Sequence, residues 1–259
     1  MSSRVALQVG VLARRALLRS ARQPATIVPS LLFPMFLLAV NSGGLEPATR
    51  IPGFPTDRYV DFALAFAFVQ GALFATTNGG TDLARDVDTG FLNRLALTPV
   101  SAPALLVGQL AGVVALGLVQ ALFFLAVGLV AGVSIQAGFI GVLTILALAV
   151  TIGTAFAGVG AFLALRTGSG EAVQGLFPVL FIFLFLSSMA LPRNLIQTDW
   201  FRTVATYNPV SYLIEAIRSL IISGWNAQAI ALGFGLATAI AVVSLTAASL
   251  ALTSRLERT

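Results

Sequence analysis

Six apolar stretches, each about as long as a membrane-spanning helix, fill most of this 259-residue chain. They cover roughly residues 26–42, 60–79, 104–130, 139–165, 175–191 and 227–252. A helix needs about 20 apolar residues to cross ~30 Å of hydrocarbon, and in lipid its backbone polar groups must be satisfied within the segment. The stretches therefore predict an all-α, polytopic membrane protein with six transmembrane helices.

The composition supports this class and excludes several functions. The chain is 58% hydrophobic and only 10% charged, whereas soluble domains carry about 25% charged residues. It contains no cysteine and no histidine, so disulfides, thiol chemistry and the commonest metal ligand are excluded. We expect no catalytic residues, no metal site and no cofactor bound by this chain.

All 15 basic residues are arginine, because the sequence contains no lysine. A Walker A loop places a lysine on the nucleotide phosphates, so this chain carries no standard ATP-binding motif and is not expected to be an enzyme. The net charge of +5 could indicate nucleic-acid binding. Arginines that flank membrane spans explain the charge better, and we expect no nucleic-acid partner.

We expect a single permease domain over residues 1–259, because no long linker is visible. Residues 1–25 are predicted to form a cytoplasmic interfacial helix, with Arg4, Gln8, Arg15, Arg19 and Arg22 on one side facing lipid phosphates. A signal peptide is the less favoured alternative, since the apolar part starts late. Residues 26–252 form the six-span core, and residues 253–259 a cytoplasmic tail.

Arginine counts predict the orientation. With both termini inside, the inner segments hold ten arginines and the outer segments five. The inner ones are Arg4, Arg14, Arg15, Arg19, Arg22, Arg85, Arg94, Arg166, Arg255 and Arg258, and the outer ones are Arg50, Arg58, Arg193, Arg202 and Arg218. The positive-inside rule then places both termini in the cytoplasm.

A polar segment, Thr81 to Pro103, separates the second and third expected spans. Asp88-Thr89-Gly90 can start a helix there, since polar and acidic residues are favoured at a helix N-terminus. Phe91, Leu92, Leu95 and Ala96 would form its apolar face, and Thr98-Pro99 would end it. We predict a short cytoplasmic helix; an ordinary solvated loop is the alternative.

A second short helix is expected between residues 192 and 228, before the sixth span. Its apolar residues repeat at helical spacing from Val210 but are too few to cross the membrane. Asn208 and Pro209 are suited to be the N-cap and the first helical residue. We predict a re-entrant or interfacial helix near the outer surface, in which Glu215 and Arg218 pair.

Polar residues inside the spans are candidates for a substrate pathway. They are Gln70, Asn78, Gln120 and Thr151, with Thr144 and Thr154 as further candidates. Hydrogen bonding between helices is the alternative for each of them.

Three segments resemble the type-2 permease family of ATP-binding-cassette (ABC) exporters, in particular its daunorubicin-resistance-like members. The first is RDVDTGFLNRLALTPVSAPALLVGQLAG, which begins at Arg85. The others are RTGSGEAVQGLFPVLFIFLFLSSMALPRNLIQ and YNPVSYLIEAIRSLIISGW, and their order and spacing agree with the family pattern.

The resemblance implies six spans per subunit, an N-terminal interfacial helix and a coupling helix between spans 2 and 3 that docks on a separate ATPase subunit. By position, the coupling residues would be Asp86, Asp88, Thr89, Gly90, Phe91, Leu92, Arg94, Leu95, Thr98 and Pro99. ATP and Mg²⁺ would bind to the ATPase. Asn93 departs from the pattern, since many relatives carry an acid there.

The implied function is outward export of a small hydrophobic or amphipathic, drug-like or lipid-like substrate, driven by ATP hydrolysis in the partner. The permease would pair with a second copy of itself or a related permease, within membrane lipid. An ion-coupled secondary transporter is the first alternative, although no acid falls at the centre of an expected span. A non-transporting membrane assembly subunit is the second. The arginine-only, alanine-rich composition suggests a GC-rich bacterial genome and hence the cytoplasmic (inner) membrane.

Overall fold

The computed structural model describes residues 10–11, 13–15, 18, 22–91 and 102–256. Every regular element in these residues is a helix, which confirms the expected all-α class. The long helices are α2 (Pro24–Leu45), α3 (Tyr59–Asp88), α5 (Ala102–Val130), α6 (Gly138–Thr167), α7 (Gly170–Phe185) and α10 (Ala227–Leu256). The shorter ones are α8 (Asp199–Tyr207), α9 (Pro209–Ile222) and the 3-10 turns η1 (Glu46–Arg50) and η2 (Arg193–Leu195).

Among the described residues, five segments are long and apolar enough to cross a membrane. They are Ile27–Arg50, Tyr59–Asp88, Leu110–Val130, Gly138–Thr167 and Ala227–Arg255. Each overlaps one of the expected spans, so the prediction of a multi-pass membrane protein is confirmed.

The expected span at residues 175–191 is not confirmed as a membrane-crossing helix. The helix there, α7, has 16 residues, about 24 Å at 1.5 Å per residue, and is shorter than ~30 Å of hydrocarbon. It begins early because Ser169 acts as its N-cap, with Oγ accepting from the Ala172 N–H at 3.2 Å. It ends at Phe185, and the apolar run that follows it is not helical.

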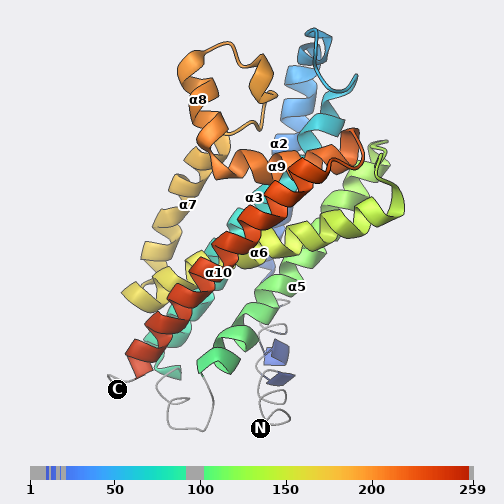
Figure 1. The fold of residues 1–259 in the computed structure, drawn as a ribbon. Coiled ribbons are helices and arrows are strands. Elements are labelled where there is room, and N and C mark those ends of the chain that lie inside the picture. Colours follow the sequence, from blue (N-terminus) through green and yellow to red (C-terminus); the bar gives the residue numbers. More distant parts are fainter. Residues whose placement is uncertain (1–9, 12, 16–17, 19–21, 92–101, 257–259) are drawn as a thin grey trace.

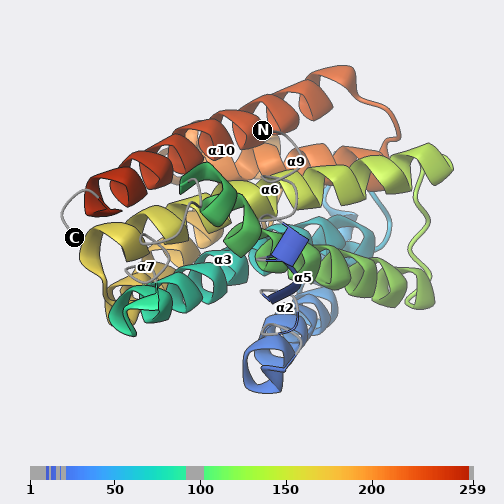
Figure 2. The same cartoon turned by 90° about the horizontal axis from the view of Figure 1, so that it is seen from below.

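α3 is the central helix of the bundle. Seen along the bundle, it is surrounded by α2, α5, α6 and α7 (Figure 2), and most of its residues are buried. The starts of α5 and α7 and the ends of α3, α6 and α10 lie toward one end of the bundle (Figure 1). We call this the terminal end. The opposite end carries α8 and α9, and we call it the α8–α9 end.

α3 and α6 cross closely where two glycines leave room for backbone contact. A Cβ on Gly160 would lie 2.0 Å from the Thr76 carbonyl oxygen, and a Cβ on Gly80 would lie 2.9 Å from the Gly160 carbonyl oxygen. Both distances are shorter than any real contact allows. Small residues let membrane helices approach in this way, and here glycine is required at both positions.

α3 continues well beyond the point where a polar connection was expected. Its last turns include Thr81 and run to Asp88, where the Thr89 N–H donates to the Arg85 carbonyl at 2.9 Å. Gly90 follows with φ of +67°, the left-handed conformation that ends many helices. Asp88-Thr89-Gly90 therefore ends α3, which was not predicted, because Gly90 adopts this conformation without strain. Phe91, directly after Gly90, is helical again, and the rest of the expected short helix lies outside the described residues.

Candidate functional site

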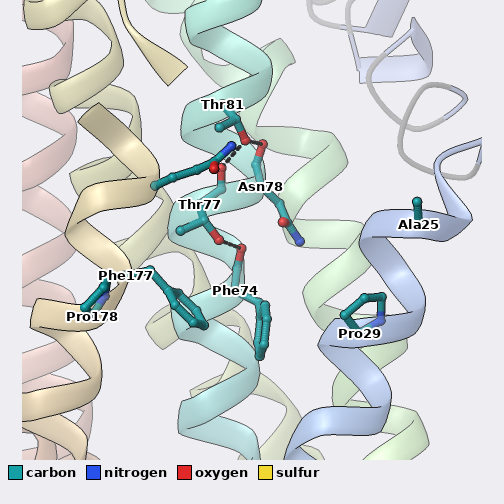
Figure 3. Close-up of a pocket in the computed structure, with 9 residues that line it drawn as sticks. Ala25, Pro29, Phe74, Thr77, Asn78, Thr81, Phe177 and Pro178 are labelled. Carbon is teal, nitrogen blue, oxygen red and sulfur yellow. Dashed lines mark hydrogen bonds between the residues drawn. The ribbon is translucent and has the colours of Figure 1, made fainter. Parts of the chain in front are cut away.

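A pocket of about 440 Å³ lies between α2, α3 and α7 (Figure 3). Its lining residues are Ala25 and Pro29 on α2, Phe74, Thr77, Asn78 and Thr81 on α3, and Gln174, Phe177 and Pro178 on α7. Because α2 and α7 begin at Pro24 and Gly170, the pocket lies close to the terminal end. Four polar side chains face it beside apolar and aromatic ones, a combination typical of small-molecule sites.

α3 supplies the polar wall of this pocket. Thr77, Asn78 and Thr81 fall on one helix face, since residues three and four apart are neighbours. The Thr77 hydroxyl donates to the Phe74 carbonyl at 3.1 Å, and the Thr81 hydroxyl donates to the Thr77 carbonyl. Both hydroxyl oxygens can still accept. Asn78 Nδ2 is buried without a partner among the described residues, so an acceptor on a ligand would satisfy it.

A row of phenylalanine rings leads away from the pocket along α7. Phe177 lies 5.0 Å from Phe74 and 4.6 Å from Phe181, measured between ring centroids. Phe33 of α2 lies 5.8 Å from Phe181, and Phe185 lies 6.0 Å from it. Rings at these distances contact one another, so the row forms an aromatic surface from the pocket toward the α8–α9 end.

Two of the four predicted pathway residues, Gln70 and Asn78, lie on the pocket side of α3. Asn78 lines the pocket itself. Gln70 lies one turn before Phe74 on the same helix face. It is fully buried, and neither its Oε1 nor its Nε2 has a partner among the described residues.

The other two predicted pathway residues bond elsewhere and do not line the pocket. Gln120 of α5 is buried and donates to Ser30 Oγ of α2 at 2.6 Å. Thr151 of α6 donates to the Ala147 carbonyl of its own helix at 2.8 Å. The sequence did not predict Thr77, Thr81 and Gln174 as pocket residues. Gln174 could have been predicted, because it is the one polar side chain in the apolar run that follows Glu171.

At the terminal end, an ion pair between Arg15 and Asp86 joins the N-terminal segment to α3. Its Nη1 and Nη2 each lie 3.1 Å from a carboxylate oxygen of Asp86, which is almost fully buried. The guanidinium carbon also lies 3.8 Å from the ring centroid of Phe91. The prediction that Arg15 faces lipid phosphates was therefore wrong. Arg15 faces protein, because a bidentate ion pair with a buried carboxylate holds its guanidinium there.

The predicted coupling residues are only partly within the described chain. Asp86 and Asp88 lie in the last turn of α3, Asp86 buried and Asp88 exposed, and Thr89, Gly90 and Phe91 follow directly. The remaining predicted ones, Leu92, Arg94, Leu95, Thr98 and Pro99, lie outside the described residues, as does Asn93.

At the α8–α9 end, the predicted start of the short helix is confirmed. Asn208 is the N-cap of α9, its Oδ1 accepting from the Val210 N–H at 2.9 Å, and Pro209 is the first helical residue. Asn208 Nδ2 also donates to the Phe183 carbonyl at 2.6 Å. The N-cap thus joins α9 to the last turn of α7.

Arg218 and Glu215 do not pair with each other as predicted. Glu215 accepts from Arg193 at 2.5 Å. Arg218 is buried and donates to the main-chain carbonyls of Ser188 at 2.9 Å and Met189 at 3.1 Å, just beyond the end of α7. These carbonyls lie in the non-helical chain after α7, where buried carbonyls need a hydrogen-bond donor, and Arg218 supplies it.

No group of three or more His, Cys, Asp or Glu residues that could hold a metal ion occurs within the described ranges. The features that the structure brings together are instead an amphipathic pocket, an aromatic row and a terminal end at which Arg15 binds Asp86.

A protein-family model described as ABC-2 type transporter matches residues 7–222. The daunorubicin resistance ABC transporter permease protein DrrB1 of Streptomyces coeruleorubidus is 26% identical over 212 residues, which are 80% of this chain and 72% of that protein. The putative transport permease ycf38 of Porphyra purpurea is 27% identical over 85% of this chain and 76% of its own length. The probable doxorubicin resistance ABC transporter permease protein DrrC of Mycobacterium tuberculosis is 27% identical over 81% of this chain and 75% of its own length.

Proposed function

Because the chain belongs to the ABC-2 type transporter family, we propose that it is the permease subunit of an exporter that moves a hydrophobic or amphipathic, drug-like or lipid-like molecule outward. Family members are membrane subunits without an ATP site of their own, and the ATPase is a separate subunit. A chain without lysine agrees with this division, since the usual phosphate-binding loop needs one.

The pocket between α2, α3 and α7 is the observation that carries the proposal for the substrate. Its polar wall offers hydroxyl and amide groups, and Phe74 and Phe177 offer aromatic surface. A molecule with a polar group and an apolar or aromatic body satisfies both. The aromatic row would guide such a molecule toward the α8–α9 end, past Gln70, whose buried amide could bind its polar group in transit.

In the proposed complex, the terminal end faces the cytoplasm of a bacterial cell, both chain termini lie there, and α7 with the residues after it completes a sixth pass. A separate ATPase subunit binds ATP and Mg²⁺, and a second copy of this chain or a related permease completes the membrane part. Coupling would pass through Asp86, Asp88, Thr89, Gly90, Phe91, Leu92, Arg94, Leu95, Thr98 and Pro99. The Arg15–Asp86 pair would then move with this segment.

The test is ATP-dependent export from vesicles that contain the permease and its ATPase, with a matched pair of threonine variants. Thr77→Val removes a hydroxyl from the pocket, and Thr151→Val removes one that lies outside it. Within the described part of the chain, each wild-type hydroxyl donates to a carbonyl of its own helix. We expect Thr77→Val to lower substrate-stimulated ATP hydrolysis several-fold and Thr151→Val to leave it unchanged. Equal effects would remove the pocket from the transport pathway.

The energy source needs its own test. Vesicles that hold a proton gradient but no ATP should show no export. Robust export under that condition would replace the ATP-coupled function with an ion-coupled one.

The coupling segment is tested by Leu95→Asp, which places a charge on the expected apolar docking face. We expect the variant to insert into the membrane normally but to lose the stimulation of ATP hydrolysis by substrate. Wild-type export by Leu95→Asp would contradict the coupling assignment.

A further inference from the structure

Two prolines lie in the walls of the pocket between α2, α3 and α7. Pro29 lies inside α2 and Pro178 inside α7, and both line the pocket. Figure 3 shows the two rings on opposite sides of the α3 residues that form the polar wall. A proline inside a helix has no N–H to donate to the carbonyl four residues earlier. Each of the two walls therefore contains one main-chain carbonyl without its helical donor.

These two carbonyls belong to Ala25 and Gln174. Ala25 lies four residues before Pro29, and Gln174 lies four residues before Pro178. All four residues line the pocket. Because both members of each pair lie on the pocket side of their helix, the carbonyl between them lies on that side as well. The pocket thus has a hydrogen-bond acceptor on each of two opposite walls, in addition to the polar side chains of α3.

The side-chain hydroxyls around the pocket donate to other carbonyls. Ser30 Oγ, next to Pro29, donates to the Ile27 carbonyl at 2.8 Å. Thr77 and Thr81 donate within α3. In a membrane, a carbonyl that a proline has freed needs a donor from outside its own helix. A bound molecule that donates hydrogen bonds would supply one to each wall.

None of the described residues that line the pocket carries a charge. An ionised group would lie there without a partner of opposite charge, which is costly inside a membrane. A hydroxyl or an amide fits better, because it donates to a carbonyl while its oxygen accepts from Asn78 Nδ2, which is buried without a partner among the described residues. The rings of Phe74 and Phe177, with centroids 5.0 Å apart, offer a surface for an aromatic or apolar body.

We propose that Pro29 and Pro178 determine the specificity of the pocket. By opening the Ala25 and Gln174 carbonyls, they select an uncharged molecule that carries hydroxyl or amide donors on two sides of an aromatic or apolar body. This proposal rests on the substrate role proposed for the pocket. It narrows the substrate to molecules that donate hydrogen bonds, and it excludes those that only accept them, such as ethers and esters.

Two naphthalene derivatives test the need for donors. The diol 1,5-bis(hydroxymethyl)naphthalene carries an O–H donor on each side, whereas 1,5-bis(methoxymethyl)naphthalene, its diether, keeps both oxygens but has no donor. Binding to the purified full-length permease is measured by equilibrium dialysis, with protein-free micelles as the blank. We expect the diol to bind at least about tenfold more tightly, since the diether loses two hydrogen bonds. Equal affinities would overturn the proposal.

Proline variants test the two carbonyls. Pro29→Ala and Pro178→Ala each return an N–H to the helix and so close one carbonyl. Alanine favours a helix more than proline does, so both variants should fold, which size-exclusion chromatography checks. We expect each variant to weaken binding of the diol about fivefold, and the double variant to weaken it roughly 25-fold, because the two walls act independently. Binding of the diether should not change.

Pro34→Ala is the matched control. Pro34 also lies inside α2, but it is not among the residues that line the pocket, so its replacement should leave the binding of both probes unchanged. A loss of diol and diether binding by the same factor in Pro29→Ala and Pro178→Ala would show that the prolines only shape the pocket, and would overturn the proposal. Tighter binding of the dication 1,5-bis(aminomethyl)naphthalene than of the diol would overturn it as well.

Phe177→Leu distinguishes a failure of this inference from a failure of the pocket. It reduces the aromatic surface and should weaken the binding of diol and diether by a similar factor. If Phe177→Leu has this effect and the two proline variants have none, the pocket remains the binding site and the role of the prolines is refuted. If no variant at a pocket residue changes the binding of either probe, the substrate role of the pocket and the inference drawn from it fail together.

Discussion

Arg218 of α9 stacks on Phe62 of α3, with its guanidinium carbon 3.5 Å from the ring centroid, and its Nε donates to the Phe62 carbonyl at 3.1 Å. Two further nitrogens of the same guanidinium bind carbonyls beyond the end of α7. We expect Arg218→Met to lower the free energy of unfolding by about 3 kcal/mol, since each lost hydrogen bond is worth about 1 kcal/mol. Chemical or thermal unfolding in detergent measures this change.

Arg202→Met is the matched control for Arg218→Met. Arg202 is exposed and pairs only with Asp199 on the surface of α8. Surface pairs contribute little, so this variant should cost less than about 1 kcal/mol. Similar losses for the two variants would show that Arg218 does not hold the three helices together.

The Arg15–Asp86 pair should control how firmly the N-terminal segment is attached. Its Asp86 side chain is 4% exposed and its Arg15 side chain 37% exposed. Asp86→Asn removes the charge but not the shape, and we expect trypsin to cleave after Arg14 and Arg22 about tenfold faster, which corresponds to ~1.4 kcal/mol of local opening.

Asp57→Asn is the control for Asp86→Asn, because Asp57 is an exposed aspartate in the connection between η1 and α3. It should leave the cleavage rate unchanged. An unchanged rate in Asp86→Asn would mean that the pair does not hold the segment.

The helices of the bundle could be predicted from the sequence because lipid imposes a length and a composition on each span. Asn208 and Pro209 were equally predictable, since N-cap chemistry is local. The end of α3 was not predictable from the same rules. From the sequence alone, Asp82 and Asp86 indicate a polar loop between two spans. In the structure both belong to α3, where Gln23 and Arg15, from a distant part of the sequence, donate hydrogen bonds to them.

In the candidate site, too, residue types could be predicted from the sequence, but contacts between distant segments could not. Gln70, Asn78, Gln120 and Thr151 were all visible as polar residues in apolar helices, but only Asn78 lines the pocket. The packing of α2 and α7 on α3, which sets it apart, is not visible in the sequence. Arg218 was assigned to Glu215 by spacing, while its real partners are main-chain carbonyls, which carry no signal in a sequence.

The crossing of α3 and α6 should tolerate no side chain at Gly160. A Cβ there would meet the Thr76 carbonyl oxygen at 2.0 Å, and backbone cannot yield as a flexible side chain does. We expect Gly160→Ala to cost about 3 kcal/mol, at the upper end of overpacking effects, and to reduce the folded fraction seen by size-exclusion chromatography.

Gly153→Ala is the control on the same helix, because a Cβ there would meet nothing within 4 Å. It should be neutral or stabilising by up to about 1 kcal/mol, since alanine favours the helix more than glycine. A Gly160→Ala variant as stable as Gly153→Ala would mean that α3 and α6 are further apart than described.

Gln70 and Gln120 should respond in opposite ways to the same substitution. Gln70 is buried with its amide unpartnered among the described residues, whereas the Gln120 amide donates to Ser30 Oγ at 2.6 Å. An unsatisfied buried amide costs about 1–3 kcal/mol. We therefore expect Gln70→Leu to raise the free energy of unfolding by about 1 kcal/mol and Gln120→Leu to lower it by about as much.

Transport measurements on Gln70→Leu and Gln120→Leu distinguish an effect on stability from an effect on function. If the Gln70 amide binds the polar group of a passing substrate, Gln70→Leu should reduce export although it stabilises the protein, and stimulation of ATP hydrolysis by substrate should fall with it. Gln120→Leu should reduce export only as far as it reduces the amount of folded permease. A stabilised Gln70→Leu variant with full export would leave Gln70 without a role in the pathway, because its amide would then be dispensable to both fold and substrate.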